Sequence, residues 1–185
     1  MIIPILAYGD PLLKKFGEEI DPDYPGLEKF IADMFDTMYA AKGVGLAAHQ
    51  VNKSIRLFIV DASPYVDEDK DLEDFREVFI NPIILKEEGT EWVFNEGCLS
   101  IPGIREDVKR QPKITIEYYD ESFSLKEKVF EGMAARIIQH EYDHVEGVLF
   151  TDRINPLRRR LLSGKLKNVA KGKVEIDYKM KFPLK

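Results

Sequence analysis

The segment His140-Glu141-Tyr142-Asp143-His144 has the pattern H-E-x-x-H. On a helix, residues four positions apart lie one turn apart on the same face, so both imidazoles would project from that face. Two neutral imidazoles so placed can share a metal ion, and the glutamate between them can reach a water bound to it. Apolar Ile137 lies on the same stripe, where polar groups are costly unless they are paired or bind metal. The pattern therefore predicts a metal site rather than an exposed polar face.

A catalytic metal site of this kind needs a third protein ligand. The metzincin pattern H-E-x-x-H-x-x-G-x-x-H fails, because Gly147 fits but Phe150 stands where the third histidine should be. The gluzincin pattern fails as well, because no glutamate lies between residues 146 and 175. The remaining soft or imidazole candidates are Cys98 and His49.

Cys98 follows a predicted strand, in the segment Glu96-Gly97-Cys98-Leu99-Ser100, and Gly97 allows a sharp backbone turn there. A lone cysteine can also be an inert buried thiol, but next to H-E-x-x-H we favour the ligand. His49 lies in the segment Gly43-Val44-Gly45-Leu46-Ala47-Ala48-His49-Gln50. We do not predict His49 as a ligand, because its imidazole could equally face solvent or lie outside the ring of metal ligands.

The elements that must position these residues follow from the apolar patterns. Helical spacing predicts helices over residues 25–41 and 133–146. The tail, residues 156–185, is predicted to form a short helix over 156–169, followed over 174–182 by a strand in which apolar and polar residues alternate. The segment 64–77 is acidic and is expected to be a surface insertion. We expect one α+β domain over 1–185, with antiparallel or mixed sheets packed around the helix that carries the motif. Strands are predicted at 55–60, 78–86, 90–94, 113–119 and 125–130.

Composition limits the classes of function. The chain has 185 residues, 44% hydrophobic and 32% charged, which excludes a disordered chain, and no apolar run approaches the roughly 18 residues of a membrane-spanning helix. A single cysteine and the lack of a signal-peptide pattern lead us to expect a cytoplasmic protein without membrane contact. The net charge is −6, yet residues 151–185 hold 11 Lys/Arg against 3 Asp/Glu. An acidic body argues against DNA as a partner, whereas the basic tail could contact RNA or simply be a solvated face.

Three segments, GVGLAAHQ (43–50), EGCLS (96–100) and QHEYDHVEG (139–147), together resemble the signature motifs of the peptide deformylases. The resemblance implies removal of the formyl group from N-formylmethionyl nascent peptides. It implies one metal ion per chain held by Cys98, His140 and His144, with Fe²⁺ as the native ion and Ni²⁺, Co²⁺ or Zn²⁺ able to replace it. It also implies Glu141 as the acid–base residue, and Gln50 with the Leu99 N–H around the reacting carbonyl.

Substrate binding can be sketched from the neighbouring residues. Methionine needs an apolar slot, which Val44, Leu99 and Ile137 could line, although each could equally be plain core. The peptide could pair its backbone with Gly45 as an added strand. The ribosome is a candidate partner through the basic tail.

Two other functions remain open from the sequence. One is a metalloprotease that cuts internal peptide bonds. A comparison of formylated with unformylated peptides as substrates would separate it from a deformylase. A ribosome- or RNA-binding protein with a closed structural metal site would need His49 as its fourth ligand.

Overall fold

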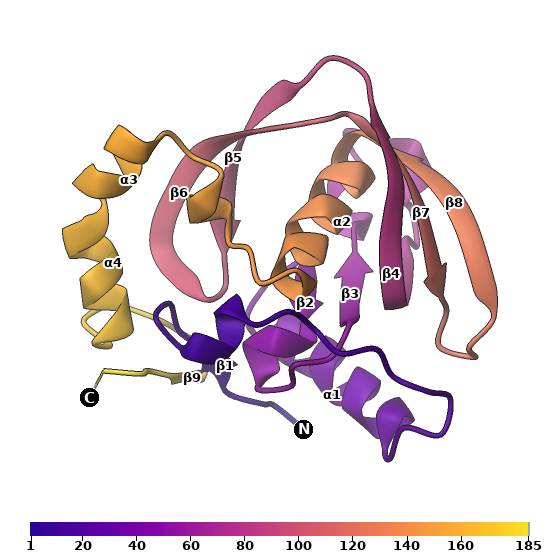
Figure 1. Cartoon of the computed structure of the whole chain (residues 1–185), viewed down its shortest axis with the longest axis horizontal. Coiled ribbons are helices and arrows are strands. Elements are labelled where there is room, and N and C mark those ends of the chain that lie inside the picture. Colours follow the sequence, from indigo (N-terminus) through magenta and orange to yellow (C-terminus); the bar gives the residue numbers. More distant parts are fainter. Residues whose placement is uncertain (185) are drawn as a thin grey trace.

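The computed structural model describes residues 1–184 and has an α+β fold, as the sequence predicts. Its largest sheet has five antiparallel strands in the order β2-β3-β4-β7-β8. A separate hairpin pairs β5 with β6, and a short parallel pair joins β1 to β9 (Figure 1). The strand bounds are β1 Ile5–Leu6, β2 Gly45–Ala47, β3 Leu57–Asp61, β4 Arg76–Glu88, β5 Trp92–Cys98, β6 Ile101–Arg110, β7 Lys113–Tyr119, β8 Leu125–Glu131 and β9 Met180–Lys181.

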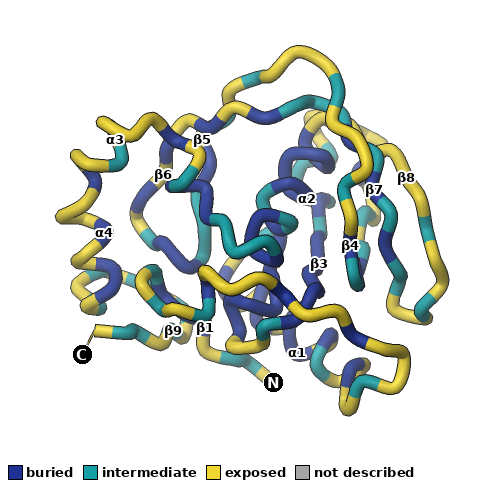
Figure 2. Tube along the Cα trace, viewed as in Figure 1, coloured by how far each residue is buried: buried dark blue, intermediate teal, exposed yellow. Residues whose placement is uncertain are grey.

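Helix α2 (Gly132–Val145) is the predicted motif-bearing helix, and it lies between the five-stranded sheet and the β5–β6 hairpin (Figure 1). Nearly all of its residues are buried (Figure 2). Two residues after the end of the helix, Gly147 has φ +73°, and its N–H donates to the His144 carbonyl at 3.1 Å. A Cβ at this position would lie 2.6 Å from the Lys14 carbonyl oxygen, so the close approach of the N-terminal segment requires glycine.

Helix α1 (Leu27–Ala40) confirms the prediction over residues 25–41. Its apolar stripe is fully buried against β2, β3 and the N-terminal segment, which fits the helical spacing seen in the sequence. The residues of this stripe are Leu27, Ile31, Met34, Phe35 and Met38.

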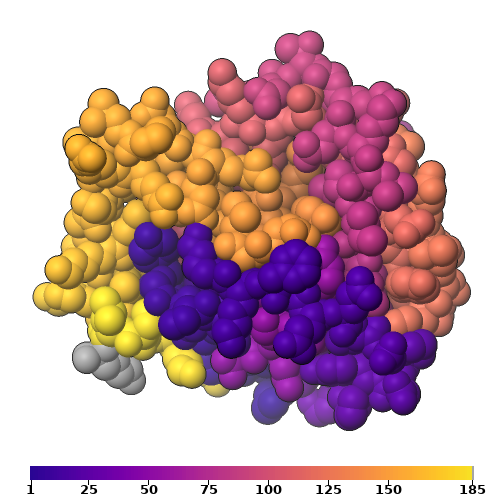
Figure 3. All heavy atoms as spheres, in the orientation of Figure 1, coloured from indigo at the N-terminus to yellow at the C-terminus, as the bar shows by residue number. Residues whose placement is uncertain are grey.

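The N-terminal segment crosses the surface beside the chain that follows α2 (Figure 3). The Gly17 N–H donates to the Val145 carbonyl at 2.8 Å, which ties this segment to the end of α2. Among residues 1–184, no helix has the length and apolar character needed to cross a lipid bilayer.

One predicted strand needs correction, and one strand was missed. The predicted strand over 174–182 is wrong for most of its length, because only Met180 and Lys181 pair with another strand. The alternation of half-buried and exposed residues is present there, but β1 offers only two residues for pairing. Strand β6 was not predicted, because charged Glu106 and Arg110 occupy buried positions in its alternation.

The remaining differences concern the insertion and the tail. Residues 64–77 are not purely a surface segment, since Leu72 is buried and Tyr65 packs against the core. The predicted helix over 156–169 is divided into α3 (Pro156–Leu161) and α4 (Ser163–Ala170).

Candidate metal centre and active site

Cys98 at the end of β5 comes together with His140 and His144 in the C-terminal half of α2. Each offers one ligand atom, and these atoms lie within 4.8 Å of one another. The Cys98 Sγ atom is 3.4 Å from Nε2 of His144, and the two imidazole rings lie 5.3 Å apart as expected for one helical turn. The structure therefore gathers the three residues that the sequence motifs single out.

The donor set fits a transition-metal ion. His140 directs its Nδ1 atom at a carboxylate oxygen of Glu96, which leaves its other ring nitrogen for an ion. Nδ1 of buried His144 has no hydrogen-bond partner among the described residues. One thiolate with two imidazoles suits Fe²⁺, Co²⁺, Ni²⁺ or Zn²⁺ better than Mg²⁺ or Ca²⁺. His49 lies outside this group of three. The solvent-facing position considered for it from the sequence is wrong, because His49 is fully buried, and a Cβ on Gly17 would lie 2.9 Å from its ring.

Glu96 anchors a buried charge network beneath the three candidate ligands. Its carboxylate accepts hydrogen bonds from Arg110 at 2.7 and 3.0 Å and from Arg136 at 2.8 Å, in addition to the His140 contact. Burial alone would raise the pKa of Glu96, but the His140 and Arg110 contacts outweigh it and hold that pKa well below its usual range. No role for Glu96, Arg110 or Arg136 is predicted from the sequence. The one feature of the sequence that could have indicated this network is the position of Glu96 within the EGCLS segment.

Asp143 extends the same network on the other side of α2. Its carboxylate accepts a hydrogen bond from Arg110 at 2.8 Å and two more from Arg153. Asp143 is thereby paired with two arginines. Because α2 is tied through Asp143 to β6 and to the chain after α2, the rotation of the motif helix is fixed.

Glu141 projects into the cavity next to the ligand group. Its side chain is buried and Oε2 has no hydrogen-bond partner among the described residues, so the carboxyl group is available to a substrate. Burial raises the pKa of Glu141 to about 7. A carboxyl group poised near neutral pH can both accept and donate a proton.

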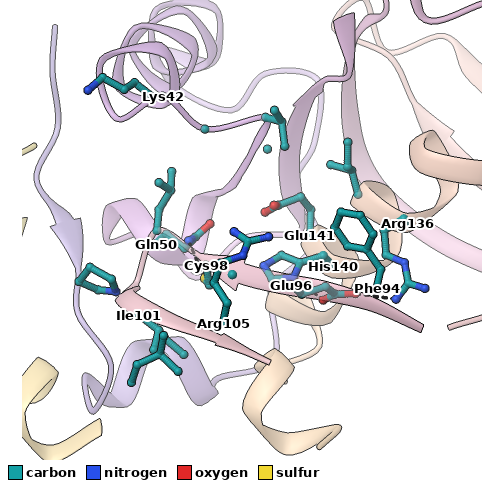
Figure 4. Close-up of a pocket in the computed structure, with 18 of the residues that line it drawn as sticks. Lys42, Gln50, Phe94, Glu96, Cys98, Ile101, Arg105, Arg136, His140 and Glu141 are labelled. Atoms are coloured by element: carbon teal, nitrogen blue, oxygen red, sulfur yellow. Dashed lines mark hydrogen bonds and ion pairs between the residues drawn. The ribbon is translucent and has the colours of Figure 1, made fainter. Parts of the chain in front are cut away.

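Gln50 lies across the cavity with its amide orientation fixed. Oε1 accepts the Ala47 N–H at 2.9 Å, while Nε2 donates to the Ser100 hydroxyl at 3.1 Å and lies 3.5 Å from the Cys98 sulfur. Figure 4 shows the Gln50 amide and the Glu141 carboxyl group pointing into the same space above Cys98 and His140. One N–H of Gln50 is therefore donated to Ser100, and the nitrogen lies on the side of the cavity where Cys98 is found.

The cavity around these groups has a volume of about 480 Å³. The expected substrate-binding residues Val44, Gly45 and Ile137 all line it, and so does Leu99. The sequence did not indicate four further lining residues from the hairpin, the insertion and α2, namely Tyr65, Phe94, Arg105 and Met133.

Comparison with known proteins gives one consistent family. The family model described as polypeptide deformylase matches residues 2–160. A peptide deformylase from Christiangramia forsetii is 56% identical over 190 residues, covering 99% of this chain and 97% of its own length. One from Flavobacterium johnsoniae is 57% identical over 189 residues, covering 98% and 96%.

Solved structures agree with the sequence relatives. The crystal structure of a peptide deformylase from Legionella pneumophila superposes with a TM-score of 0.81 at 38% identity, covering 94% of this chain and 98% of that one. A peptide deformylase from Thermotoga maritima gives 0.76 at 38% identity, covering 84% and 99%. The chain therefore belongs to the polypeptide deformylases, metal-dependent hydrolases that remove the formyl group from the N-terminus of newly made polypeptides.

Proposed function

We propose that residues 1–185 form one catalytic domain in which Cys98, His140 and His144 hold a single Fe²⁺ ion for deformylation. The observation that carries this proposal is the cluster of three ligand atoms within 4.8 Å at the cavity that Glu141 and Gln50 also face. A divalent ion bound there supplies Lewis-acid activation of water and polarisation of the formyl oxygen. Ni²⁺, Co²⁺ and Zn²⁺ suit the same donors, and a thiolate next to ferrous iron makes the native enzyme sensitive to oxygen.

Glu141 is proposed as the proton carrier. The reaction converts a formamide and water into formate and an amine, so one proton must leave the attacking water and one must reach the departing nitrogen. The free Oε2 atom of Glu141 takes the first proton and delivers it to the amine nitrogen. Such acid–base assistance is typically worth about 10²–10⁴ in rate.

Gln50 and the Leu99 N–H are proposed as donors to the oxygen of the formyl carbonyl while negative charge develops on it. The amide of Gln50 is held in place by Ala47 and Ser100 before substrate arrives, so little reorganisation is needed during the reaction. Loss of one such preorganised donor typically reduces kcat by about 10²–10³.

The methionine side chain is proposed to occupy the apolar part of the cavity at Val44 and Ile137. Strand β2, which contains Gly45, is an edge strand of the five-stranded sheet with β3 on one side. A nascent peptide can add to the other side as a further strand, because main-chain hydrogen bonds do not depend on the peptide's sequence. This mode of binding suits an enzyme that must process many different chains.

The ribosome is proposed as a partner of the basic tail. Helix α3 carries Arg158, Arg159 and Arg160 together with exposed Leu157 and Leu161. We infer that the reaction occurs in the cytoplasm, where chains leave the ribosome with their formyl group. Co-sedimentation with ribosomes should weaken as salt is raised, and Arg160→Glu should weaken it further. Binding without salt dependence would argue against this contact.

The function is tested with anaerobically purified protein loaded with Fe²⁺ or Ni²⁺. Three peptides are compared, formyl-Met-Ala-Ser, acetyl-Met-Ala-Ser and Met-Ala-Ser. We expect formate from the first peptide, no acetate from the second, and no cleavage of the Met-Ala bond in any of them. Cleavage of internal peptide bonds would instead indicate a peptidase, and absence of formate with both ions would contradict the proposal.

A further inference from the structure

The chain after α4 returns to the active-site region through a segment that lies beyond the match to the family model, which ends at residue 160. Strand β9 pairs with β1 (Figure 1), where the Ile5 N–H donates to the Lys179 carbonyl and the Ala7 N–H to the Lys181 carbonyl, both at 2.9 Å. Next to this pairing, Asp177 forms an exposed ion pair with Lys42 at 2.5 Å. These contacts place residues 177–181 against the outside of the catalytic cavity.

Tyr178 makes the most specific of these contacts. Its hydroxyl donates to the Leu99 carbonyl oxygen at 2.7 Å, and its half-buried ring packs against the core that contains α1. Burial is the largest of the effects that raise the pKa of Tyr178 above its ordinary value, so the hydroxyl remains a donor throughout the physiological pH range. Tyr178 does not line the cavity, whereas Leu99, whose carbonyl it contacts, does.

The Leu99 carbonyl belongs to the central peptide of the two-residue turn between β5 and β6. Cys98 pairs with Ile101 across this turn, and Leu99 and Ser100 form its corners. The soft motion of such a turn is a flip of the central peptide, which changes ψ of the first corner and φ of the second by about 150° or more. A hydrogen bond to the central carbonyl blocks that flip.

The peptide that would flip lies between the two proposed oxyanion donors. The Leu99 N–H comes directly before the peptide that would flip. The Ser100 hydroxyl, which comes directly after it, accepts a hydrogen bond from Nε2 of Gln50 at 3.1 Å. The Ser100 carbonyl is braced separately by the Tyr8 N–H at 2.8 Å. Tyr178 thus holds the one carbonyl that lies between the two donor positions.

We propose that Tyr178 is a positioning residue for deformylation, which fixes the Leu99–Ser100 peptide and thereby orients the Leu99 N–H and the Gln50 amide toward the developing oxyanion. The inference rests on the roles proposed above for Gln50 and Leu99. It gives the tail of this chain a part in the chemistry, in addition to any contact with the ribosome.

The test is Tyr178→Phe, which removes the hydroxyl and keeps the ring. Loss of one intramolecular hydrogen bond should lower kcat by about three- to tenfold, with KM and metal content within about twofold of the wild type. Affinity for a methionyl peptide with a tetrahedral phosphonate in place of the formyl group should fall by the same factor as kcat/KM. Affinity for the deformylated product should not change, because the product lacks the oxyanion.

Tyr118→Phe is the matched control. It also removes a tyrosine hydroxyl bond, here to Glu77 within the five-stranded sheet, and Tyr118 does not line the cavity. We expect it to lower Tm while kcat stays at the wild-type value.

Three results would overturn the inference. The first is a Tyr178→Phe variant with wild-type kcat. The second is a loss of kcat that follows lost metal. The third is an equal loss of affinity for product and phosphonate, which would indicate general loosening of the cavity. An inactive wild type would contradict the proposed function itself and is thus distinguishable from these results.

Discussion

The Nδ1 atom of His140 lies 3.0 Å from Oε2 of Glu96, and this contact fixes the ring of one proposed metal ligand. Glu96 is itself held by Arg110 and Arg136, so the carboxylate has little freedom to move. Carboxylates that accept the outer N–H of a metal-binding histidine orient the ring and increase its basicity. The buried network therefore prepares the site for an ion.

Glu96→Gln tests this preparation. The amide keeps the shape of the carboxylate but loses the charge that both arginines and His140 require. We expect metal affinity to fall by roughly 10- to 100-fold, measured by competition with a chelator, together with a lower Tm. Glu106→Gln is the control, because Glu106 is also buried and pairs with Arg158 outside the cavity. Equal metal affinity in the two variants would contradict the assigned role.

Gly45 is expected to tolerate no side chain. A Cβ there would lie 2.5 Å from Oε1 of Glu141 and 2.8 Å from its Cδ, so Gly45→Ala must displace the proposed proton carrier. Displacement by about 1 Å can reduce activity by roughly 100-fold, and we expect kcat to fall by about 10- to 100-fold while metal remains bound. Steady-state formate release with metal analysis checks this.

Gly164→Ala is the contrasting substitution. Gly164 lies in α4, and a Cβ there meets no atom within 4 Å. This variant should keep full activity and gain about 0.5–1 kcal/mol of stability, because alanine favours the helix. If the Gly45→Ala variant were as active as Gly164→Ala, the position of the Glu141 side chain would not be critical for catalysis, which would contradict this prediction.

His49 should make the fold sensitive to acid. Burial lowers the pKa of His49 from 6.5 to about 4, so the ring stays neutral in the folded protein while the unfolded chain takes up a proton below pH 6.5. The unfolded state then binds more protons, and the stability present above pH 6.5 is lost as the pH falls toward 4. Between pH 7 and pH 5 this amounts to about 2 kcal/mol.

The measurement is urea unfolding of wild type and His49→Asn at both pH values. The variant lacks the titrating ring, so its loss of stability between pH 7 and pH 5 should be smaller by that amount. Other acid-sensitive groups are common to both proteins and cancel. Parallel losses in the two proteins would mean that His49 does not control this transition.

The sequence could predict the parts of the site that depend on local geometry. His140 and His144 share a face because of helix periodicity alone, and α2 extends over nearly the expected residues. Cys98 was a weaker prediction from its own surroundings and became specific only in combination with the other motifs. The burial alternation in the tail was also predictable, although most of its predicted strand does not form.

The partners that support the site could not be predicted in the same way. Arg110 and Arg136 lie 14 and 40 residues from Glu96 in the chain, and no local pattern indicates which carboxylate each one meets. Tyr178 is 79 residues from Leu99, and its hydroxyl contact depends on a tail that pairs over only two residues. Long-range polar pairing is set by the tertiary fold, which hydrophobic periodicity does not encode.

Formate release by the metal-loaded wild type, compared with Glu141→Gln, tests the central claim most directly. The amide replaces the proton carrier at nearly constant shape and leaves all three proposed ligands in place. We expect formate release from formyl-Met-Ala-Ser to fall by about 10²–10⁴-fold while the bound metal stays near one ion per chain. A variant that keeps its metal and releases formate at the wild-type rate would contradict the role of Glu141.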